Sequence, residues 1–248
     1  VQMHAGPILA WYEKLSKKKQ VMVAKIFSSA DRMLVLGEYW KKQMATIIHA
    51  DKIEILYNGA ECPRENPYNT NGKYILYMGL LKKTKGTYDL IDAIKLIDNE
   101  LSQDIKVYLC GVDENGETAR YVAKQGLQNR IVMPGWINKS TRLELFKNTQ
   151  ICALPSYFEA LSMTVIEAMC YGIPMVTTNI STMPELLGDE IEKIEPGDVQ
   201  GLAELIRKLV RSRELRLNNS RIEYSRAKEK FSQEKIMRRT VDIYNEVE

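Results

Sequence analysis

The chain has 248 residues, of which 45% are hydrophobic and 27% are charged, proportions that are typical of a folded globular protein. Its 35 basic and 32 acidic residues give a net charge of +3, a balance that argues against a protein dedicated to binding nucleic acid. No apolar stretch approaches the ~20 residues of a membrane span, and the N-terminus has no signal-peptide pattern. We therefore expect a cytoplasmic protein.

The four cysteines, Cys62, Cys110, Cys152 and Cys170, are far apart and form no C-x-x-C pair. Three of them lie in apolar segments. This spacing indicates neither a metal site nor a disulfide framework, and it fits a reducing compartment.

The first part of the chain contains few secondary-structure elements. We expect helices over 7–29 and 38–49, and strands at 32–36 and 53–56. These elements are too few to cover both faces of a parallel sheet, so residues 1–57 are typical of the back half of a domain whose front half is absent. Val1 is also not an initiator methionine. The expectation is a fragment, a processed product or one part of a split protein.

After a linker rich in Asn, Pro and Gly at 58–72, short apolar runs alternate with helix-length amphipathic segments. The strands are expected at 74–78, 105–110, 130–134, 150–155 and 174–178, and the helices at 86–99, 115–126, 140–148 and 162–171. From residue 197 onward the pattern is helical. Such alternation is typical of a parallel sheet with helices on both faces. Because ligands bind beyond the carboxyl ends of these strands, we expect the functional site in the loops that follow them.

Two glutamates, Glu159 and Glu167, lie on either side of a mostly apolar stretch after the fourth of these strands. Ser162 can cap a helix beginning at Met163, which places Glu167 in its second turn. The backbone N–H groups of about 161–164 would then form an anion site at the strand end. Carboxylates suit the hydroxyls of a ribose and of a sugar, so the pattern predicts a nucleotide sugar as ligand.

The first strand of this region leads into Gly79 and then Lys85, which stands beside the start of another helix. Both loops belong to the same sheet edge, so Lys85 can be a point charge for phosphate. Taken alone, an exposed lysine in solvent is the simpler interpretation. Its register with the two glutamates favours the phosphate role.

Three stretches together resemble the GT-B glycosyltransferases of the large retaining family four, the group 1 glycosyl transferases. They are "GLLKKTKG" (79–86), "PGWI" (134–137) and "EALSMTVIEAM" (159–169). The resemblance covers nearly the whole chain. It implies an α/β fold of GT-B type, with a complete doubly wound Rossmann-like C-terminal domain (73–230) and the end of an N-terminal Rossmann-like domain (1–57). Residues 58–72 would be the hinge, and 231–248 a terminal helix that crosses back onto the first domain.

The resemblance also implies roles for single residues. Lys85 would bind the donor diphosphate, Glu159 would lie by the transferred sugar, and Glu167 would bond the ribose. His4 matches a histidine that faces the acceptor side in the family, so Glu159, Lys85 and His4 are the candidate catalytic residues. The other binding residues would be Gly79 in the loop, Gly135, Trp136 and Ile137 along the base, and Ala160, Leu161, Ser162 and Met163 through backbone amides. No metal or cofactor is expected besides the donor.

One position departs from the family. Leu80 stands where an arginine is usual, so one of two cations expected for the diphosphate is missing. Lys82 or Lys83 could substitute, although a solvated loop lysine is the simpler interpretation of each.

The basic run from Lys14 to Lys19 follows Trp11 and Tyr12. A solvated helix face is the simpler interpretation of this stretch, and a helix lying on anionic lipid is the alternative. Peripheral contact with the inner membrane face would suit an enzyme with a lipid-linked acceptor.

The expected reaction is transfer of a sugar from a nucleotide diphosphate donor to a hydroxyl of a glycan or lipid-linked acceptor, with retained anomeric configuration. The alternative is a non-catalytic nucleotide-sugar-binding module, or an inactive fragment that needs a missing N-terminal segment or a second chain. An oxidoreductase ranks below both, because no G-x-G-x-x-G follows a strand. We expect the chain alone to bind donor but to transfer sugar poorly.

Overall fold

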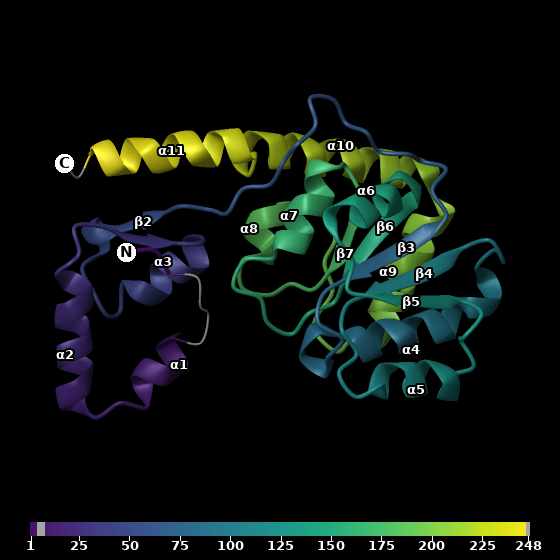
Figure 1. The fold of residues 1–248 in the computed structure, drawn as a ribbon, viewed down its shortest axis with the longest axis horizontal. Coiled ribbons are helices and arrows are strands. Elements are labelled where there is room, and N and C mark those ends of the chain that lie inside the picture. The colour runs from purple at the N-terminus through teal and green to yellow at the C-terminus, as the bar shows by residue number, and fades with distance from the viewer. Residues whose placement is uncertain (4–7, 247–248) are drawn as a thin grey trace.

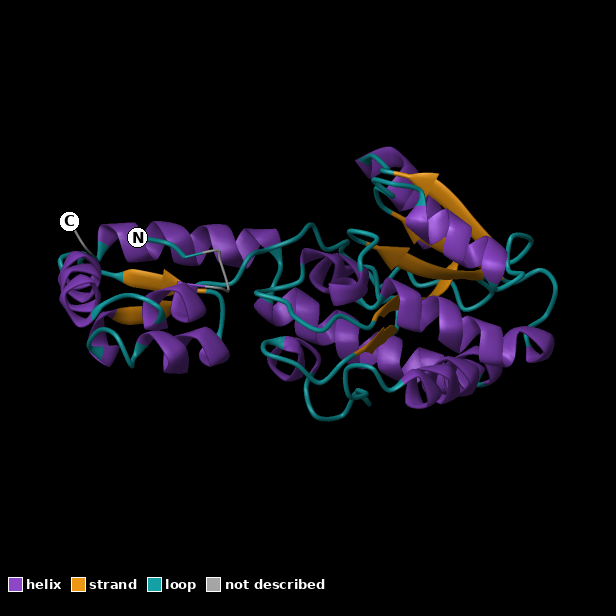
Figure 2. Cartoon of the chain, turned by 90° about the horizontal axis from the view of Figure 1, so that it is seen from below, coloured by secondary structure: helices purple, strands orange, loops and turns teal. Residues whose placement is uncertain are grey.

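The structure is a computed structural model that describes residues 1–3 and 8–246. It contains a small and a large parallel sheet, each with its own helices, and a long C-terminal helix that extends from the large sheet to the small one (Figure 1). Figure 2 gives the same arrangement from below, with the two sheets clearly separated.

The first part of the chain forms the small sheet, in which β1 and β2 pair in parallel with Met33 opposite Ile53. The elements in chain order are α1 (Ile8–Glu13), α2 (Lys17–Ser28), β1 (Met33–Val35), α3 (Glu38–Met44), the 3-10 turn η1 (Ala50–Lys52) and β2 (Ile53–Ile55). The single helix expected over 7–29 is interrupted, because Ser16 adopts an extended conformation between α1 and α2. The helix expected over 38–49 also ends early, at Met44.

The large sheet has five parallel strands in the order β5-β4-β3-β6-β7. They are β3 (Tyr74–Met78), β4 (Lys106–Cys110), β5 (Ile131–Gly135), β6 (Thr149–Leu154) and β7 (Met175–Thr177). All five agree with the expected strands to within a few residues. The chain runs outward from β3 to β5 and then returns to β6 on the other side of β3. The sheet is therefore doubly wound, with its switch point between β3 and β6.

Helices cover both faces of the large sheet. Helix α4 packs with α5 and α9, while α7 packs with α10. Their bounds are η2 (Lys83–Lys85), α4 (Thr87–Ile97), η3 (Asp98–Glu100), α5 (Glu117–Lys124), α6 (Lys139–Asn148), α7 (Met163–Cys170), α8 (Met183–Leu187), α9 (Val199–Arg211) and α10 (Arg213–Lys230). Strands β6 and β7 are buried along their whole length, as expected where helices cover both faces of a sheet.

The C-terminal helix α11 (Gln233–Asn245) begins directly after α10 and lies over the small sheet (Figure 1). At the break, Ala60 of the linker donates to the carbonyl of Phe231 at 2.9 Å and accepts from Gln233 at 2.8 Å. Farther along, Ile243 packs with Leu34 and Leu56. The linker and the C-terminal helix therefore run side by side between the two sheets. The division into domains with the boundaries given above stays a prediction.

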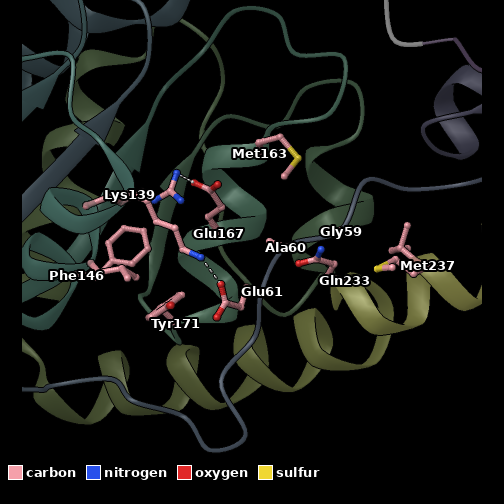
Figure 3. A pocket seen from close by; sticks show the side chains of 13 residues that line it. Gly59, Ala60, Glu61, Lys139, Phe146, Met163, Glu167, Tyr171, Gln233 and Met237 are labelled. Carbon is pink, nitrogen blue, oxygen red and sulfur yellow. Dashed lines mark hydrogen bonds and ion pairs between the residues drawn. The ribbon is translucent and has the colours of Figure 1, made fainter.

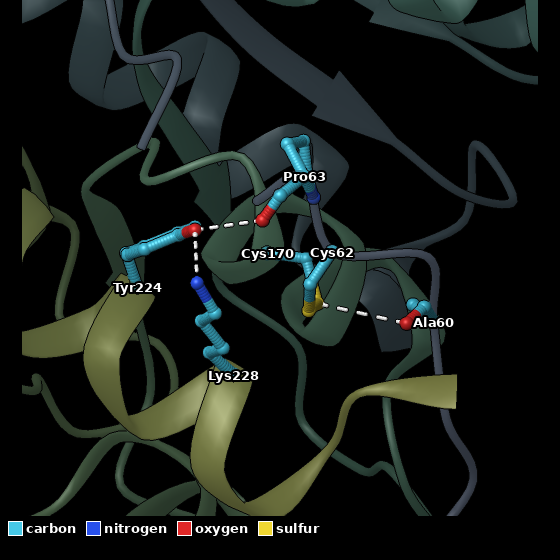
Figure 4. Close-up of a disulfide and its surroundings, with 6 residues drawn as sticks. All are labelled: Ala60, Cys62, Pro63, Cys170, Tyr224 and Lys228. Atoms are coloured by element: carbon cyan, nitrogen blue, oxygen red, sulfur yellow. Dashed lines mark hydrogen bonds between the residues drawn. A yellow bond between two sulfur atoms is a disulfide. The ribbon is translucent and has the colours of Figure 1, made fainter. Parts of the chain in front are cut away.

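The linker is also bonded covalently to the large sheet's helices, since Cys62 forms a disulfide with Cys170 at the end of α7 (Figure 4). The expectation that no disulfide would form was wrong. The two residues are 108 positions apart in sequence but only 4.6 Å apart between Cα atoms, because the linker crosses the end of α7. This pairing removes the argument for a reducing compartment that we based on the cysteines. Cys110 and Cys152 are free and buried.

Candidate functional site

The carboxyl ends of β3 and β6 meet at the switch point of the large sheet, and the loops that follow them hold Lys85 and Glu159 together. Lys85 Nζ lies 2.7 Å from Glu159 Oε1, and Ser156 Oγ donates to the same oxygen at 2.8 Å. The side chains of Lys85 and Glu159 are 25% and 12% exposed. Each charge is thus neutralised where the side chains are mostly buried and an isolated charge would be costly.

The two loops approach each other closely because of Gly86, which lies between η2 and α4. Its φ of 67° is in the left-handed region, and a Cβ there would stand 1.9 Å from the carbonyl oxygen of Pro155. Tyr157 N–H also donates to the carbonyl of Thr84 at 3.0 Å. Glycine is required at this point because a side chain would push η2, and with it Lys85, away from the β6 loop.

Helix α7 begins as the sequence predicts. Ser162 is its N-cap and accepts from the N–H of Val165, and Thr164 Oγ1 donates to the carbonyl of Met78 at 3.1 Å. The first N–H groups of the helix have no intrahelical partners. Their position beside the end of β3 makes them donors for an anion at the switch point.

Glu167 lies in the second turn of α7 and has a partner that the sequence analysis missed. Arg142 of α6 places Nη1 at 2.9 Å from Glu167 Oε2, and the two side chains are 29% and 21% exposed. Burial raises the pKa of Glu167, and the nearby Arg142 and Lys139 oppose that shift. From sequence alone, Arg142 is one of many charged residues on an ordinary solvated helix.

A cavity of about 310 Å³ lies at the ends of β3, β4 and β5, and neither Lys85 nor Glu159 is among the residues that line it. Gly79 and Leu80 line it after β3, Trp136 and Ile137 line it after β5, and Arg142, Thr164 and Glu167 complete it from α6 and α7. Trp136 is 74% exposed, so its ring forms an open wall. Four of the predicted binding residues, Gly79, Trp136, Ile137 and Glu167, therefore line one cavity, although they come from three distant parts of the sequence.

A second cavity of about 290 Å³ is also lined by Arg142 and Glu167, and Figure 3 shows the residues around it. It is bounded by the linker at Gly59–Glu61 and by α11 at Gln233 and Met237, and Met163 lines it from α7. Lys139 and Glu61 form an ion pair at 2.6 Å on its rim, with both side chains more than 60% exposed. The half-buried pair between Arg142 and Glu167 lines both cavities and is thus the partition between them.

The remaining predicted residues are placed as follows. Ala160 and Leu161 lie in the loop between Glu159 and α7, where Leu161 is buried. Gly135 ends β5 with a φ of 78° and open space where a Cβ would stand. His4 lies outside the described residues. Lys82 and Lys83 line a different cavity of about 180 Å³, and Lys82 lies 3.8 Å from Glu114.

Several further residues were not predicted, because they act on the site from elsewhere in the chain. Ser181 and Thr182, just before α8, hold the backbone of Glu159 and Ala160. Trp40 from α3 also donates to the carbonyl of Ala160. No local pattern in the sequence points to these contacts, since each joins residues that are more than twenty positions apart.

Comparison with known proteins assigns the family. Residues 60–228 match the family described as Glycosyl transferases group 1, so the chain belongs to that family. This agrees with the resemblance found in the sequence, and most of the site lies inside the matched range.

Among curated relatives, the O-antigen chain mannosyltransferase B of Escherichia coli is 23% identical over 196 residues, covering 77% of this chain and 51% of the relative. The MMP alpha-(1->4)-mannosyltransferase of Mycolicibacterium hassiacum is 28% identical over 64% of this chain and 39% of its own length. The chain thus spans about half the length of the curated relatives that it matches, or less.

Solved structures give the same fold. Sucrose-phosphate synthase from Thermosynechococcus elongatus superposes with a TM-score of 0.80 at 19% identity, covering 99% of this chain and 67% of the other. Anabaena HepE in complex with UDP and glucose gives a TM-score of 0.78 at 18% identity, with 98% and 70% covered. The expected α/β fold of GT-B type is confirmed by these matches.

Proposed function

We propose that the protein transfers a sugar from a nucleotide diphosphate sugar to a hydroxyl group of a glycan or lipid-linked acceptor, with retention of configuration. The observation that carries the proposal is the 310 Å³ cavity at the switch point of the large sheet, lined by Glu167, Arg142 and the loop after β3. In doubly wound folds this crevice is where nucleotides bind. The likeness to HepE, whose structure was solved with UDP and glucose, supports a nucleotide sugar as donor.

In this proposal Glu167 accepts hydrogen bonds from the ribose hydroxyls. Its partner Arg142 lines the same cavity, so its guanidinium can take over part of the role of the arginine that Leu80 replaces. Guanidinium groups suit phosphate oxygens because their donors form a planar fork. The diphosphate then lies between Arg142, the first amides of α7 and Lys85.

Lys85 and Glu159 exchange partners when the donor binds. Without donor, each neutralises the other at 2.7 Å. With donor bound, the ammonium of Lys85 turns to the diphosphate and Glu159 accepts from sugar hydroxyls. Among the described residues, the hydrogen bonds to the carboxylate of Glu159 fall on Oε1, which leaves Oε2 available for the sugar. We assign Glu159 the role of a positioning and charge-balancing residue.

Charge develops on the leaving diphosphate as the bond to the sugar breaks. Lys85 and the amides at the start of α7 stabilise that charge. Such electrostatic stabilisation is stronger where water is excluded than in bulk solvent. The acceptor oxygen forms the new bond to the sugar as the bond to the diphosphate breaks, and the proton of the acceptor hydroxyl passes to the leaving diphosphate. We propose that no metal takes part, because these fixed donors already supply positive potential at the diphosphate.

Isothermal calorimetry with UDP, UDP-glucose, GDP and GDP-mannose tests the proposal. We expect one pair to bind, and we expect Lys85→Ala to weaken the diphosphates by tenfold or more while the matching nucleoside is little affected. Lys82→Ala is the matched control, since Lys82 belongs to the same loop but lines another cavity. Equal losses for diphosphate and nucleoside would remove Lys85 from the phosphate position.

A transfer assay separates the enzyme from a binding module. Donor binding without donor hydrolysis or transfer, in this chain and also in a longer chain with a supplied N-terminal segment, would favour the non-catalytic module. Transfer only in the longer chain would favour our expectation that residues 1–57 are the end of a larger acceptor-side domain.

Contact with an anionic lipid surface is a further part of the proposal. Helix α2 exposes Val21, Met22 and Ile26 by more than half, and it carries Lys17, Lys18, Lys19 and Lys25. Apolar and basic side chains on one helix are typical of interfacial binding. Within the described residues no helix is long and apolar enough to cross a membrane. Co-sedimentation with vesicles containing phosphatidylglycerol, compared with vesicles of phosphatidylcholine alone, tests this contact.

A further inference from the structure

Helix α3, which follows the small sheet, contacts the loop that carries Glu159. Trp40 on α3 is almost completely buried, and its indole Nε1–H donates to the carbonyl of Ala160 at 2.6 Å. Its ring also meets Phe158 edge-on, with 6.1 Å between centroids. The contact joins residues 120 positions apart, and it places the first part of the chain against the residue that follows Glu159.

Glu185 holds the start of α3 in this position. Its two carboxylate oxygens accept from the backbone N–H of Glu38 at 3.0 and 2.9 Å, and Oε1 also accepts from the hydroxyl of Tyr57. A Cβ at Gly37 would stand 2.6 Å from Glu185 Oε2, so glycine is what lets the backbone come this close. The carboxylate of Glu185 thus binds both the start of α3, which follows β1, and Tyr57, which lies two residues after the end of β2.

The residues just before α8 hold the same loop from the other side. Ser181 Oγ donates to the carbonyl of Glu159 at 2.6 Å, and Thr182 Oγ1 donates to the carbonyl of Ala160 at 3.2 Å. The Ala160 carbonyl therefore accepts from both Trp40 and Thr182. In the part of the chain that the structure describes, Ser181 is the one residue other than glycine with a positive φ, at 37°. Such strain persists where surrounding contacts hold it, often next to functional sites.

Helix α8 itself is fixed to the large sheet's helices. Arg226 of α10 donates to the carbonyls of Leu186 and Glu185 at 2.8 and 2.9 Å. Its guanidinium thereby satisfies carbonyls at the end of α8. Glu185 is consequently presented to α3 by a rigid support.

We propose that Glu185 is a positioning residue: by bonding Glu38 and Tyr57 it keeps Trp40 on the Ala160 carbonyl, and so orders the loop that holds the donor sugar. That this loop binds the donor sugar rests on the proposed function. The hydrogen bond from Trp40 to Ala160 is present without donor. The set of Glu185, Tyr57, Trp40 and Ala160 is called the loop clamp below. It makes order at the sugar position depend on contact between the two parts of the chain.

Hydrogen exchange of the Trp40 indole N–H in the ligand-free chain tests the clamp. The three tryptophans give three indole resonances in a ¹⁵N-labelled protein, and Trp40→Phe identifies the one that matters. We expect Glu185→Ala to raise its exchange rate at least tenfold, and Glu185→Gln, which keeps one carbonyl acceptor, to raise it less. Glu192→Ala is the matched control, because Glu192 pairs with Lys208 away from α3.

An unchanged exchange rate in folded Glu185→Ala would overturn the proposal. If that variant does not fold, Tyr57→Phe decides, since it removes one hydroxyl donor while leaving the ring against Phe231. We expect at least a threefold rise in indole exchange for Tyr57→Phe. No rise there would count equally against the clamp.

Affinity for the donor tests whether the clamp affects function. We expect Glu185→Ala to lose at least threefold more affinity for the nucleotide sugar than for the nucleotide diphosphate, measured with UDP-glucose and UDP, or with GDP-mannose and GDP if those are the pair that binds. Glu192→Ala should change neither. Equal losses would contradict a specific role at the sugar. If the wild-type chain binds none of these four ligands, the proposed function fails while the exchange result still decides the clamp.

Discussion

The two sheets of this protein differ in how they obtain their stability. The large sheet has five strands, of which β6 and β7 are buried along their whole length, whereas the small sheet has two strands of three residues each. Helices α1 and α2 contribute no buried side chain among the described residues. Among the described residues, every buried polar or charged side chain lies at Thr87 or later, in the part of the chain that forms the large sheet and its helices. The large sheet and its helices thus form a hydrophobic core of their own. The small sheet depends on contacts with other parts of the chain for its stability.

Those contacts explain how a two-stranded sheet can be ordered at all, since such a pair alone is marginal in water. Helix α11 covers one side with Ile243, and Arg239 pairs with Glu54 of β2. The loop clamp holds the other end through Trp40. The small sheet and the loop that carries Glu159 therefore stabilise each other through these contacts.

The largest expected effect is a substitution in the core of the large sheet. Leu76→Ala removes a side chain of β3 that is completely buried, and we expect a loss of about 2–5 kcal/mol in the free energy of unfolding. Val21→Ala on α2, where the residue is 56% exposed, should change that free energy by less than about 0.5 kcal/mol. Urea unfolding of both variants checks the contrast, and comparable losses would contradict it.

Removing the disulfide is expected to have the next largest effect, because it links the linker between the two regions to α7. Cys62→Ala should lower the free energy of unfolding by about 2–4 kcal/mol. Thermal unfolding with and without reductant, with mass spectrometry to count free thiols, provides the measurement. Cys110→Ala, which leaves the pair intact, is the control for general sensitivity to reductant. A wild-type chain purified under oxidising conditions with four free thiols would contradict the pairing.

A smaller effect is expected at the partition between the two cavities. Glu167→Ala should weaken binding of the nucleotide by about 1.5–3 kcal/mol, or tenfold and more, because a charge-assisted hydrogen bond is lost. Glu61→Ala removes the exposed carboxylate across the second cavity (Figure 3) and should leave affinity within about twofold. Calorimetry on the folded variants compares them. Similar affinities for both would show that Glu167 does not contact the nucleotide.

The last prediction concerns pH and a buried group of the large region. Glu223 on α10 is completely buried, accepts from the N–H of Met175 at 3.1 Å through both oxygens, and burial raises its pKa to about 8. Because the folded chain keeps this proton and the unfolded chain releases it near pH 4.5, stability should fall as the pH rises from about 5 to about 8. The slope from this group is at most about 1.4 kcal/mol per pH unit.

Glu223→Gln should lack that part of the slope, since an amide does not titrate in this range. Urea unfolding at several pH values between 5 and 9 compares the two proteins. Parallel curves would mean that Glu223 is ionised in the folded chain throughout.

Much of the large region could be predicted from the sequence because its signals are local. The five strands are short apolar runs between turn residues, and Ser162 caps α7 from its own position in the chain. The grouping of Lys85 with Glu159 follows from the geometry of a parallel sheet, in which successive strand ends meet at one edge. These inferences need no knowledge of what packs against them.

Most of the missed features join residues that are distant in the sequence, and one is a helix too short to predict. Cys62 and Cys170 are 108 positions apart, and Glu185 lies 147 positions from Glu38. Helix α8 has only five residues, too few for a periodic pattern to indicate a helix. Arg142 is one of several charges on α6, and nothing local distinguishes it from a solvated residue.

The backbone bridge between Ala60 and Phe231–Gln233 has a mechanical consequence. The two parts of the chain are connected twice, once by the linker and once by the α10–α11 break, and the two connections are hydrogen-bonded to each other where they cross. Sliding or separation of the two crossings would break both hydrogen bonds together, so the bridge opposes relative movement of the two parts at this point. The loop clamp joins the same two parts at a second place, where Trp40 donates to the carbonyl of Ala160. A rotation about the bridge at residue 60 would have to break that contact as well, so the sugar loop resists the rotation.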